Sequence, residues 1–539
     1  MATTSESKLA STSYTHWEPS GSIDAIVIGS GLGGLTAAAM LAREAGQRVL
    51  VLERHYVPGG YTHAFHRPGF EWDVGVHYIG EVGDPTSPLR AIFDDLSEGE
   101  LQWAPMEDAY DRMISPQGTF EYVSDRQRLE QNLGEQFPRQ RDKIARYLQA
   151  VDDCVGSSQG FFVEKCLPGP LAWLAGWLLR RKFLKWASRT TAEVLSSLEL
   201  DPDLRGVLTG RWLDYGLPPG QSSFGIHAIV DRHYQRGGNY PVGGASRFAA
   251  TLIPSIRRAG GEVVIRAPVR QILVERGRAT GVVMEDGREL RARRVISNAG
   301  VHNTYLRLLP DSEQAQSLAA RARVLAPSIP YMNLYLGLDA DDRQLELPNG
   351  NLWVYPGPDH DNNLAAFLAD SQAPFPLVYI SFPSGKEPTF AERHPGHATM
   401  QALCPAAYDW FKPWEQLGSG RRGEQYEQLK EQFAERLRET VERQVPQVRG
   451  HIQHIELSTP LTNRHFVGYA VGEPYGLAHT PQRFLERRLL RPQSPIRGLY
   501  LTGQDVTTIS VVCAMISGLA CASAILGRNL MTKLAKQPK

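Results

Sequence analysis

Hydrophobic and polar residues follow two different patterns along this chain. Short, almost continuously apolar runs occur at residues 23–28 and 49–52, and such runs are typical of parallel strands buried on both faces. A further strand is predicted at residues 294–300. Between about residues 96 and 236 the pattern changes to charged, amphipathic stretches broken by Pro and Gly, which predict helices. The strand-and-glycine pattern returns at Tyr240. Pieces of one strand-rich unit are therefore expected at the start, middle and end of the chain.

The same periodicities predict further elements. Apolar residues at helical spacing predict a helix over residues 246–260, which two glycines end. Alternation over residues 69–80 predicts a strand. The other predicted elements are strands at 262–265, 269–275, 281–285, 331–338, 377–382 and 499–503 and a helix at 424–444.

Two apolar segments resemble membrane segments. Residues 506–526 carry no charge over the roughly 20 residues that a span needs, but they are rich in Ser, Thr, Gly, Ala and Cys and follow a predicted strand, so we interpret them as a buried core helix. Residues 167–186 hold a shorter apolar stretch with three Trp beside four cations, which is typical of a helix in the bilayer interface. The alternative is an amphipathic lid whose cations face solvent.

The composition of the chain mainly excludes classes of protein and of site. The 58 basic and 58 acidic residues give no electrostatic case for nucleic acid. Five cysteines without a C-x-x-C pair suggest neither a disulfide framework nor a zinc site, so no metal is expected. Residues 1–20 are polar, lack the apolar core of a secretory signal, and are interpreted as a disordered lead-in. We expect a cytoplasmic protein that is peripheral on the inner face of the membrane.

The first apolar run leads directly into a G-x-G-x-x-G motif at residues 29–34 and an Ala-rich helix. In this motif Gly29 makes the tight turn, Gly31 lets a pyrophosphate approach the backbone, and Gly34 allows close helix–strand packing. The N–H groups and positive dipole of the helix N-terminus then point at the phosphates. Glu53 follows the second apolar run, where an acid is expected to bind a ribose hydroxyl. The segment predicts a dinucleotide site.

The same glycine pattern occurs again at residues 418–423, in a different context. The preceding residues 411–417 contain Pro413 and several charges, which argue against a buried parallel strand. We therefore interpret the second copy as a flexible loop before the helix that begins near Glu424.

Six segments together resemble one known family. They are residues 29–53, 58–60, 70–80, 243–244, 297–300 and 498–526. The segments recur in the flavin-dependent phytoene desaturase-like family, which includes carotenoid desaturases, carotenoid isomerases and all-trans-retinol 13,14-reductases (retinol saturases), and the resemblance covers nearly the whole chain. Residues 73–80, 459–463 and 475–479 resemble the retinol saturase version, and Gly503-Gln504-Asp505 replaces the Gly-x-x-x-Pro-Gly common in desaturases.

The resemblance implies an α/β fold. A Rossmann-like FAD-binding domain of the glutathione reductase type would be interleaved with a mixed α+β substrate domain that bears a helical lid. The FAD-binding domain would comprise residues 21–95, 237–305 and 489–539, and the substrate domain residues 96–236 and 306–488.

The resemblance also implies FAD as the cofactor, with Glu53 on the adenosine ribose and Asp505 near the ribityl–phosphate region. Physical reasoning adds a role for the last helix, whose N-terminus Thr507, Thr508 or Ser510 could cap. Its free N–H groups would face the N1/O2 edge of the flavin, where reduced flavin carries negative charge. The alternative is that these hydroxyls only cap a buried helix. The expected cofactor-binding residues are Gly29, Gly31, Gly33, Gly34, Glu53, Arg54, Gly59, Gly60, Val269, Asn298, Ala299, Gly503, Asp505 and Thr508.

The implied reaction saturates a double bond of a long apolar polyene or isoprenoid, retinoid- or carotenoid-like. Hydride from reduced flavin would reach one alkene carbon and a proton the other. A hydrocarbon alkene has no carbonyl to polarise, so preorganisation and exclusion of water must supply much of the catalysis. The candidate proton donors are His77, Tyr78, Glu473, Tyr475 and His479, each of which would also suit a structural role.

Several alternatives stay open at this point. A desaturase or a cis–trans isomerase would use the same fold, and amine oxidases share the dinucleotide and terminal motifs. Proteins similar to GDP-dissociation inhibitors bind prenylated partners without flavin chemistry, but the intact residues 58–60 and 503–505 argue against that class. The interface-like residues 167–186 favour a lipid over an amine. Only one nucleotide motif survives scrutiny, so a dedicated NAD(P)H domain is not expected. The external electron donor is left open: NAD(P)H could visit the flavin pocket transiently, or another carrier could donate.

Overall fold

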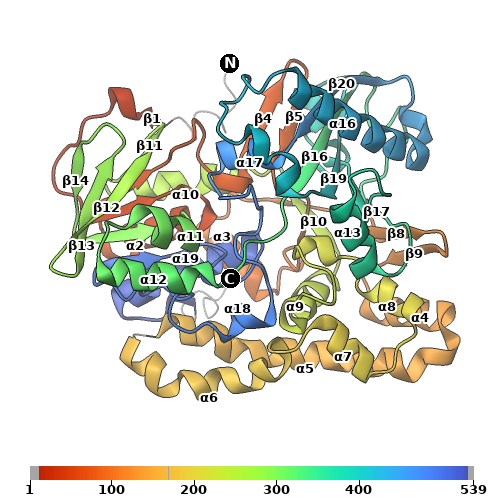
Figure 1. The fold of residues 1–539 in the computed structure, drawn as a ribbon, viewed down its shortest axis with the longest axis horizontal. Helices are drawn as coiled ribbons and strands as arrows, with labels where there is room; N and C mark the ends of the chain where they lie inside the picture. Colours follow the sequence, from red (N-terminus) through yellow and green to blue (C-terminus); the bar gives the residue numbers. More distant parts are fainter. Residues whose placement is uncertain (1–10, 168, 532–539) are drawn as a thin grey trace.

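A six-stranded parallel sheet forms one half of the molecule, on the left in Figure 1. The computed structural model describes residues 11–167 and 169–531. In spatial order the strands are β1 (Thr12–Ser13), β11 (Glu262–Ile265), β3 (Val49–Leu52), β2 (Ala25–Ile28), β15 (Arg294–Ser297) and β21 (Leu499–Leu501). As predicted, the start, middle and end of the chain meet in this sheet.

Burial on both faces explains the unbroken apolar runs. Ala25 and Val27 belong to an apolar core on one face of the sheet, while Ile26 and Ile28 belong to a second core on the other. A strand covered on both sides has no face for polar residues. A hairpin sheet lies beside it and contains β12 (Val269–Glu275), β13 (Arg278–Met284) and β14 (Glu289–Arg291).

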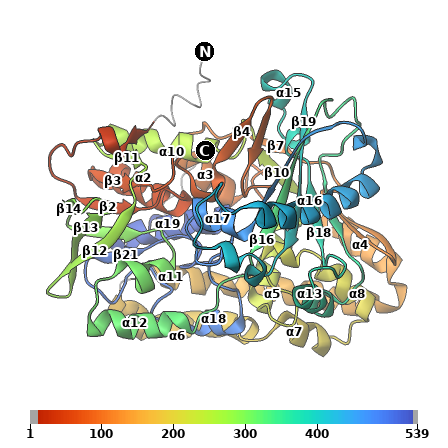
Figure 2. The same ribbon diagram turned by 45° about the horizontal axis from the view of Figure 1, so that its top comes forward.

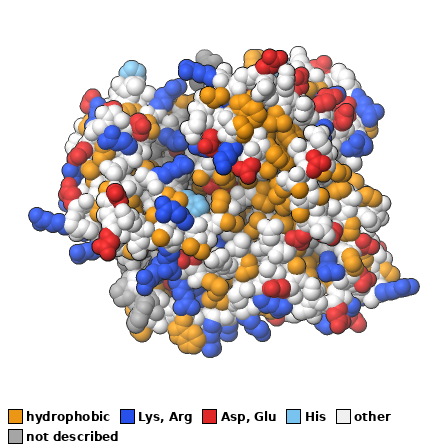
Figure 3. Space-filling view, viewed as in Figure 1, with side chains coloured by type: hydrophobic (Ala, Val, Ile, Leu, Met, Phe, Trp, Pro, Cys, Tyr) orange, Lys and Arg blue, Asp and Glu red, His pale blue; other side chains and the backbone are white. Residues whose placement is uncertain are grey.

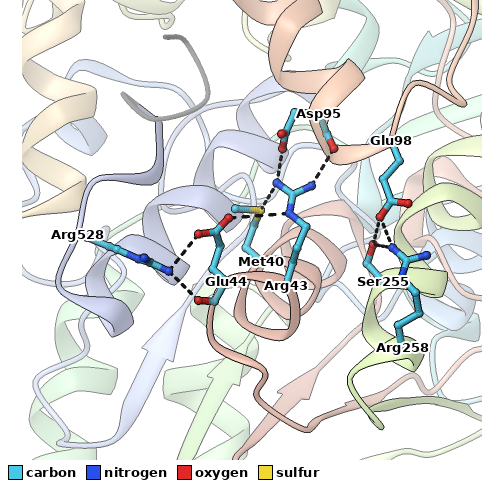
Figure 4. A network of polar contacts seen from close by, with 8 residues as sticks. All are labelled: Met40, Arg43, Glu44, Asp95, Glu98, Ser255, Arg258 and Arg528. Carbon is cyan, nitrogen blue, oxygen red and sulfur yellow. Dashed lines mark hydrogen bonds and ion pairs between the residues drawn. The ribbon is translucent and has the colours of Figure 1, made fainter. Parts of the chain in front are cut away.

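Four helices cover one of these faces: α2 (Leu32–Ala45), α3 (Pro88–Leu96), α10 (Arg247–Arg258) and α19 (Val511–Leu526). Polar contacts fix their outer ends (Figure 4): Arg43 of α2 binds the Asp95 carboxylate, Arg528 binds Glu44, and Arg258 binds Glu98. The network joins elements that are distant in sequence, although its exposed members contribute little energy individually.

A seven-stranded mixed sheet forms the other half, with α16 (Glu424–Gln444) lying across one face (Figure 2). Its strands, in order, are β20 (Ile452–Ser458), β16 (Tyr331–Leu338), β19 (Ala398–Pro405), β18 (Val378–Ser381), β17 (Asn351–Val354), β8 (Asp111–Ser115) and β9 (Gly118–Tyr122). Two small sheets complete the strands: β6 (Ile79–Gly80) with β10 (Gly238–Pro241) and β7 (Trp103–Pro105), and β4 (Ala64–Arg67) with β5 (Phe70–Asp73).

A layer of helices runs along the lower edge of both halves in Figure 1. It contains α4 (Arg126–Gln136), α5 (Arg141–Cys166), α6 (Gly169–Ala187), α7 (Thr191–Ser197), α8 (Pro202–Leu208) and α9 (Phe224–Tyr234). The remaining helices are α11 (Val301–Asn303), α12 (Glu313–Arg323), α13 (His360–Ala369), α14 (Pro383–Lys386), α15 (Phe390–Arg393), α17 (Pro460–Phe466) and α18 (Pro481–Leu485).

Two expectations differ from the structure. Residues 1–10 of the predicted disordered lead-in lie outside the described residues, but residues 11–20 include β1, and the Trp17 indole donates to Glu262 at 2.7 Å. The strand predicted over residues 69–80 is divided into β5 and β6. Backbone groups between them bond to other segments; the His77 carbonyl, for example, accepts from Lys386 Nζ at 3.1 Å. These bonds replace a continuous strand ladder.

The two apolar segments are both helical. The core helix predicted over residues 506–526 is α19, which is largely buried as expected but begins only at Val511, because the Ser510 hydroxyl caps its first turn. Across residues 11–167 and 169–531, no helix combines the length and apolar character needed to cross a bilayer. The second glycine pattern, residues 418–423, forms the loop before α16, as predicted.

The close crossing of α2 and α19 gives a test of the fold. A Cβ at Gly518 would lie 2.6 Å from the Gly33 carbonyl oxygen, so we predict that Gly518→Ala destabilises the protein by about 1–3 kcal/mol through overpacking. Gly156→Ala is the matched control, because that glycine lies within α5 with open space around its Cβ position; it should stabilise by up to ~1 kcal/mol. Thermal unfolding midpoints measure both. Equal shifts would show that the crossing tolerates a side chain.

Candidate functional site

A cavity of about 710 Å³ lies between the two halves of the molecule. One end is lined by the glycine motif and Glu53, at the carboxyl ends of β2 and β3. The other end is lined by Tyr331, Asn333 and Tyr335 of β16, in the seven-stranded sheet. The carboxyl edge of a parallel sheet is where such folds bind ligands, and here that edge opens onto a second wall with a different composition.

Backbone segments converge at the first end of the cavity. A Cβ on Gly31 would lie 2.7 Å from Asn298 Nδ2, and a Cβ on Gly33 would lie 2.7 Å from the Gly503 backbone nitrogen. A Cβ on Gly60 would lie 3.0 Å from the Gly31 Cα. Side chains at these positions would separate the segments, so the glycines are needed to form the cradle.

Glu53 is the buried acid of this cradle. Its Oε2 accepts hydrogen bonds from the backbone N–H of Ser30 at 2.8 Å and from the Ser30 hydroxyl at 2.7 Å. Its Oε1 accepts from the His55 N–H at 2.7 Å, and the Ser30 hydroxyl in turn accepts from the Gly59 N–H at 3.1 Å. The carboxylate therefore holds the glycine turn against residues 59–60 while it lines the cavity.

Most of the predicted cofactor-binding residues line this one cavity. They are Gly29, Gly31, Gly33, Glu53, Arg54, Gly59, Gly60, Val269, Asn298, Ala299 and Gly503. Gly34, Asp505 and Thr508 are not among the lining residues. Gly34 packs under the turn, since its Cβ would lie 2.3 Å from the Gly29 carbonyl oxygen.

Asp505 and Thr508 hold the chain before α19 in place. Asp505 accepts from the Val301 N–H at 2.7 Å and from the Leu477 N–H at 2.9 Å, so it joins three segments around the cavity. The Thr508 hydroxyl donates to Cys513 Sγ at 2.9 Å, and the helix cap is Ser510, whose hydroxyl accepts from the Cys513 N–H. Ser510 itself lines the cavity.

The candidate proton donors divide into two groups. His77 and Tyr475 line the cavity, whereas Tyr78, Glu473 and His479 are not among its lining residues. Burial lowers the pKa of His77 to about 3, so its imidazole is neutral at physiological pH. Its Nδ1 has no hydrogen-bond partner among the described residues.

The other three candidates are held by internal bonds. The Tyr78 hydroxyl lies between two carboxylates, those of Asp111 and Asp214. Burial raises the pKa of Glu473 to about 7, and its Oε2 accepts from the Val471 N–H at 2.8 Å. His479 Nε2 accepts from the Ile509 N–H at 3.2 Å, and burial lowers the pKa of this imidazole.

Several lining residues were not predicted from the sequence. Tyr61 and Tyr469 lie with their rings nearly parallel, the centroids 6.4 Å apart. Tyr61 directly follows the predicted Gly60, so the motif itself pointed toward it. Asn333 also lines the cavity, and its side chain donates to Gln401 at 2.8 Å within the seven-stranded sheet. No sequence motif pointed to Asn333.

Three comparisons with known proteins agree with this geometry. Residues 32–526 match the flavin containing amine oxidoreductase family. The chain is 38% identical over 531 residues to all-trans-retinol 13,14-reductase of Rattus norvegicus, covering 95% of this chain and 87% of that protein. It is 27% identical over 528 residues to chloroplastic prolycopene isomerase 1 of an Oncidium hybrid cultivar, covering 93% and 83%. An oxidoreductase structure from Methanosarcina mazei has the same fold, with a TM-score of 0.59 at 18% identity over 94% of this chain and 100% of that one.

The residues present fit a flavin. The family match starts at the first residue of α2 and ends with α19, so it spans both sides of the glycine cradle. The cradle lacks side chains where a dinucleotide backbone would lie, and a buried acid stands at the expected ribose position. The resemblance inferred from the motifs is confirmed: the chain belongs to the flavin-containing amine oxidoreductase family, in the branch that includes the all-trans-retinol 13,14-reductases.

Proposed function

We propose that the chain binds FAD and reduces one carbon–carbon double bond of a long apolar polyene of the retinoid or carotenoid type. The observation that carries the proposal is the cavity that joins the dinucleotide cradle to a wall of aromatic and apolar side chains and that His77 also lines. The 38% identity to an all-trans-retinol 13,14-reductase supports reduction over the other reactions of this fold.

FAD suits the cradle because the same cavity continues from Glu53 and the glycine turn to the residues of the seven-stranded sheet. Glu53 would bind the adenosine ribose, and the N–H groups of the glycine turn would bind the pyrophosphate. When reduced, the bound flavin supplies a hydride. Tyr331, Tyr335 and Leu403 give the opposite wall a character that matches a conjugated hydrocarbon.

His77 is the side chain we assign to proton delivery. A neutral imidazole carries one N–H that it can donate, and burial keeps His77 neutral. Because its Nδ1 makes no hydrogen bond to the described residues, no protein acceptor competes for that nitrogen. The buried setting also keeps bulk water from the reacting carbons.

The reaction is tested by incubating the dithionite-reduced protein anaerobically with all-trans-retinol, a carotene and a cis-carotenoid, followed by mass spectrometry. A gain of two hydrogens in one of them is the expected result, and the cofactor released by denaturation should have the mass of FAD. Unchanged mass with a new retention time would indicate an isomerase, as in the prolycopene isomerase relatives. Loss of two hydrogens with oxidised flavin would indicate a desaturase. Either outcome would reject reduction.

His77→Gln should lower turnover by at least ~100-fold while leaving flavin binding intact, because a positioned general acid contributes about 10²–10⁴ in rate. Tyr475→Phe is the comparison, since Tyr475 lines the same cavity; we expect less than a tenfold loss. Rates of flavin reoxidation by the polyene, with bound flavin determined by absorbance, measure both. A larger loss in the Tyr475 variant would move the donor role to that residue.

A membrane surface is the proposed source of the substrate. Leu171, Leu174 and Leu178 follow helical spacing on α6, and each is more than half exposed, as is Trp177. The Arg181 guanidinium lies 5.8 Å from the Trp177 ring centroid. Figure 3 shows Lys and Arg side chains beside hydrophobic ones along the lower edge, where α6 lies. Exposed apolar residues flanked by cations suit an anionic bilayer interface.

Replacing Leu174 and Leu178 together by Glu should reduce binding to vesicles containing anionic lipid by at least tenfold, because each substitution removes apolar contact and adds repulsion. Ile455→Glu is the matched control: Ile455 is 46% exposed but lies on β20, away from α6. Vesicle co-sedimentation measures the binding. An equal loss in both variants, or none, would contradict a specific role for α6.

A further inference from the structure

A group of buried and half-buried polar residues surrounds Tyr78, the residue that follows His77. The hydroxyl of Tyr78 is 3.0 Å from Asp111 Oδ2 and 2.9 Å from Asp214 Oδ2. Tyr78 and Asp111 are fully or almost fully buried. Asp111 comes from β8 and Asp214 from the turn after Trp212, so the contact joins three distant segments.

Counting hydrogens shows that this group holds an additional proton. A phenol hydroxyl carries one hydrogen and donates it to one acceptor. If both carboxylates were ionised, the second would face only a lone pair of the same oxygen, and the negative charges of buried Asp111 and half-buried Asp214 would lie on either side of one hydroxyl. One protonated carboxyl removes this conflict, because it donates to the Tyr78 oxygen while the tyrosine donates to the other carboxylate.

The surrounding charges are consistent with one shared proton. Burial and the neighbouring Asp111 raise the pKa of Asp214 to about 7, and burial raises the pKa of Asp111 as well. Burial lowers the pKa of Lys386 to about 7, so the one nearby amine is not permanently charged. The titratable and charged groups around the two carboxylates are Lys386, Arg211, Tyr78, Tyr110, Tyr122, Tyr215, Tyr234, Tyr331, Tyr355, Tyr379 and Tyr475. Arg211 is itself paired with Asp231.

The group contacts the cavity wall on two sides. On one side, Lys386 Nζ donates to the His77 carbonyl at 3.1 Å and to Asn351 Oδ1 at 2.5 Å, and Asn351 donates to Asp111 at 2.9 Å. The ring of Tyr379 packs edge-on against His77, with centroids 5.1 Å apart, and its hydroxyl has no partner among the described residues.

On the other side, the turn that carries Asp214 supports two tyrosines of the wall. The Tyr331 hydroxyl donates to the Leu213 carbonyl at 2.8 Å. A Cβ at Gly216 would lie 2.9 Å from the Tyr475 ring. The segment that carries Asp214 therefore contacts two residues that line the cavity.

We infer that Asp111, Tyr78 and Asp214 form a proton store that reprotonates His77 during turnover, and this rests on the proposed function. Reducing the double bond breaks one π bond and forms two C–H bonds, one from hydride and one from the His77 N–H. Loss of the N–H leaves His77 as an imidazolate, the proton of the store restores the neutral imidazole, and the store takes a proton from solvent. The two electrons come from reduced flavin. Asp111, Tyr78 and Asp214 are positioning residues, because they act through His77.

Infrared difference spectroscopy of the flavin-containing protein without substrate tests the store itself. At neutral pH the spectrum of the wild type minus that of Asp214→Asn should contain the carbonyl stretch of a protonated carboxylic acid. Asp111→Asn should remove the same band, because one remaining carboxylate accepts the tyrosine proton and ionises. Asp342→Asn, at a half-buried carboxyl elsewhere that accepts from the Ser384 hydroxyl at 2.8 Å, should keep it. Retention of the band in both single variants would overturn the store.

The pH profile tests its role in turnover. In the wild type, steady-state polyene reduction should fall about tenfold per pH unit above the pKa of the store, because the store is loaded below that pH and empty above it. Asp214→Asn should be slow throughout and nearly independent of pH, whereas Asp342→Asn should follow the wild type. A wild-type profile in Asp214→Asn would reject the role of the store. If wild-type protein reduced no polyene, the proposed function would fail while the infrared band still decided whether the store exists.

Discussion

The structure depends on a close approach between backbones at the start and end of the chain. Gly33 in the first turn of α2 approaches Gly503, and its carbonyl oxygen lies against Gly518 of α19. The side chain of Asn298, from the middle of the chain, fills the remaining space beside Gly31. Three segments separated by hundreds of residues therefore form one wall of the cavity. Any larger side chain at this point would separate the helices and open the cofactor cradle together.

Part of this arrangement follows directly from local sequence. The burial of β2 and β3 on both faces requires apolar residues at every position, and the glycine spacing has a separate steric reason at each glycine, as the contacts of Gly31, Gly33 and Gly34 illustrate. The long helices α16 and α19 also follow from composition and periodicity: α16 is amphipathic and covers one face of a sheet, whereas α19 is apolar and largely buried. Local patterns suffice where a residue's role depends on its own segment.

Other features arise only when distant segments meet. The alternation over residues 69–80 is that of a strand, but the side chain of Lys386, at the end of α14, binds the His77 carbonyl between β5 and β6, and His77 lines the cavity. Tyr78 was predicted beside His77 as a proton donor, yet its hydroxyl contacts carboxylates 33 and 136 residues away. No spacing in the sequence relates Tyr78 to Asp111 or Asp214. The fold had to be known before their shared proton could be counted.

Desolvation acts on both His77 and Asp214 and favours the neutral form of each, but the neutral form of the histidine is the deprotonated one and that of the aspartate is the protonated one. On the cavity side it favours the neutral form of His77, which keeps an N–H but removes the charge. Behind the wall it favours the protonated form of Asp214, so that a proton is retained at a pH where an exposed aspartate would have lost it. A dry site suited to a hydrocarbon is thus also a site where an acid can be kept protonated without a permanent charge beside the substrate. The apolar binding wall and the proton store are two consequences of excluding water from one region of the fold.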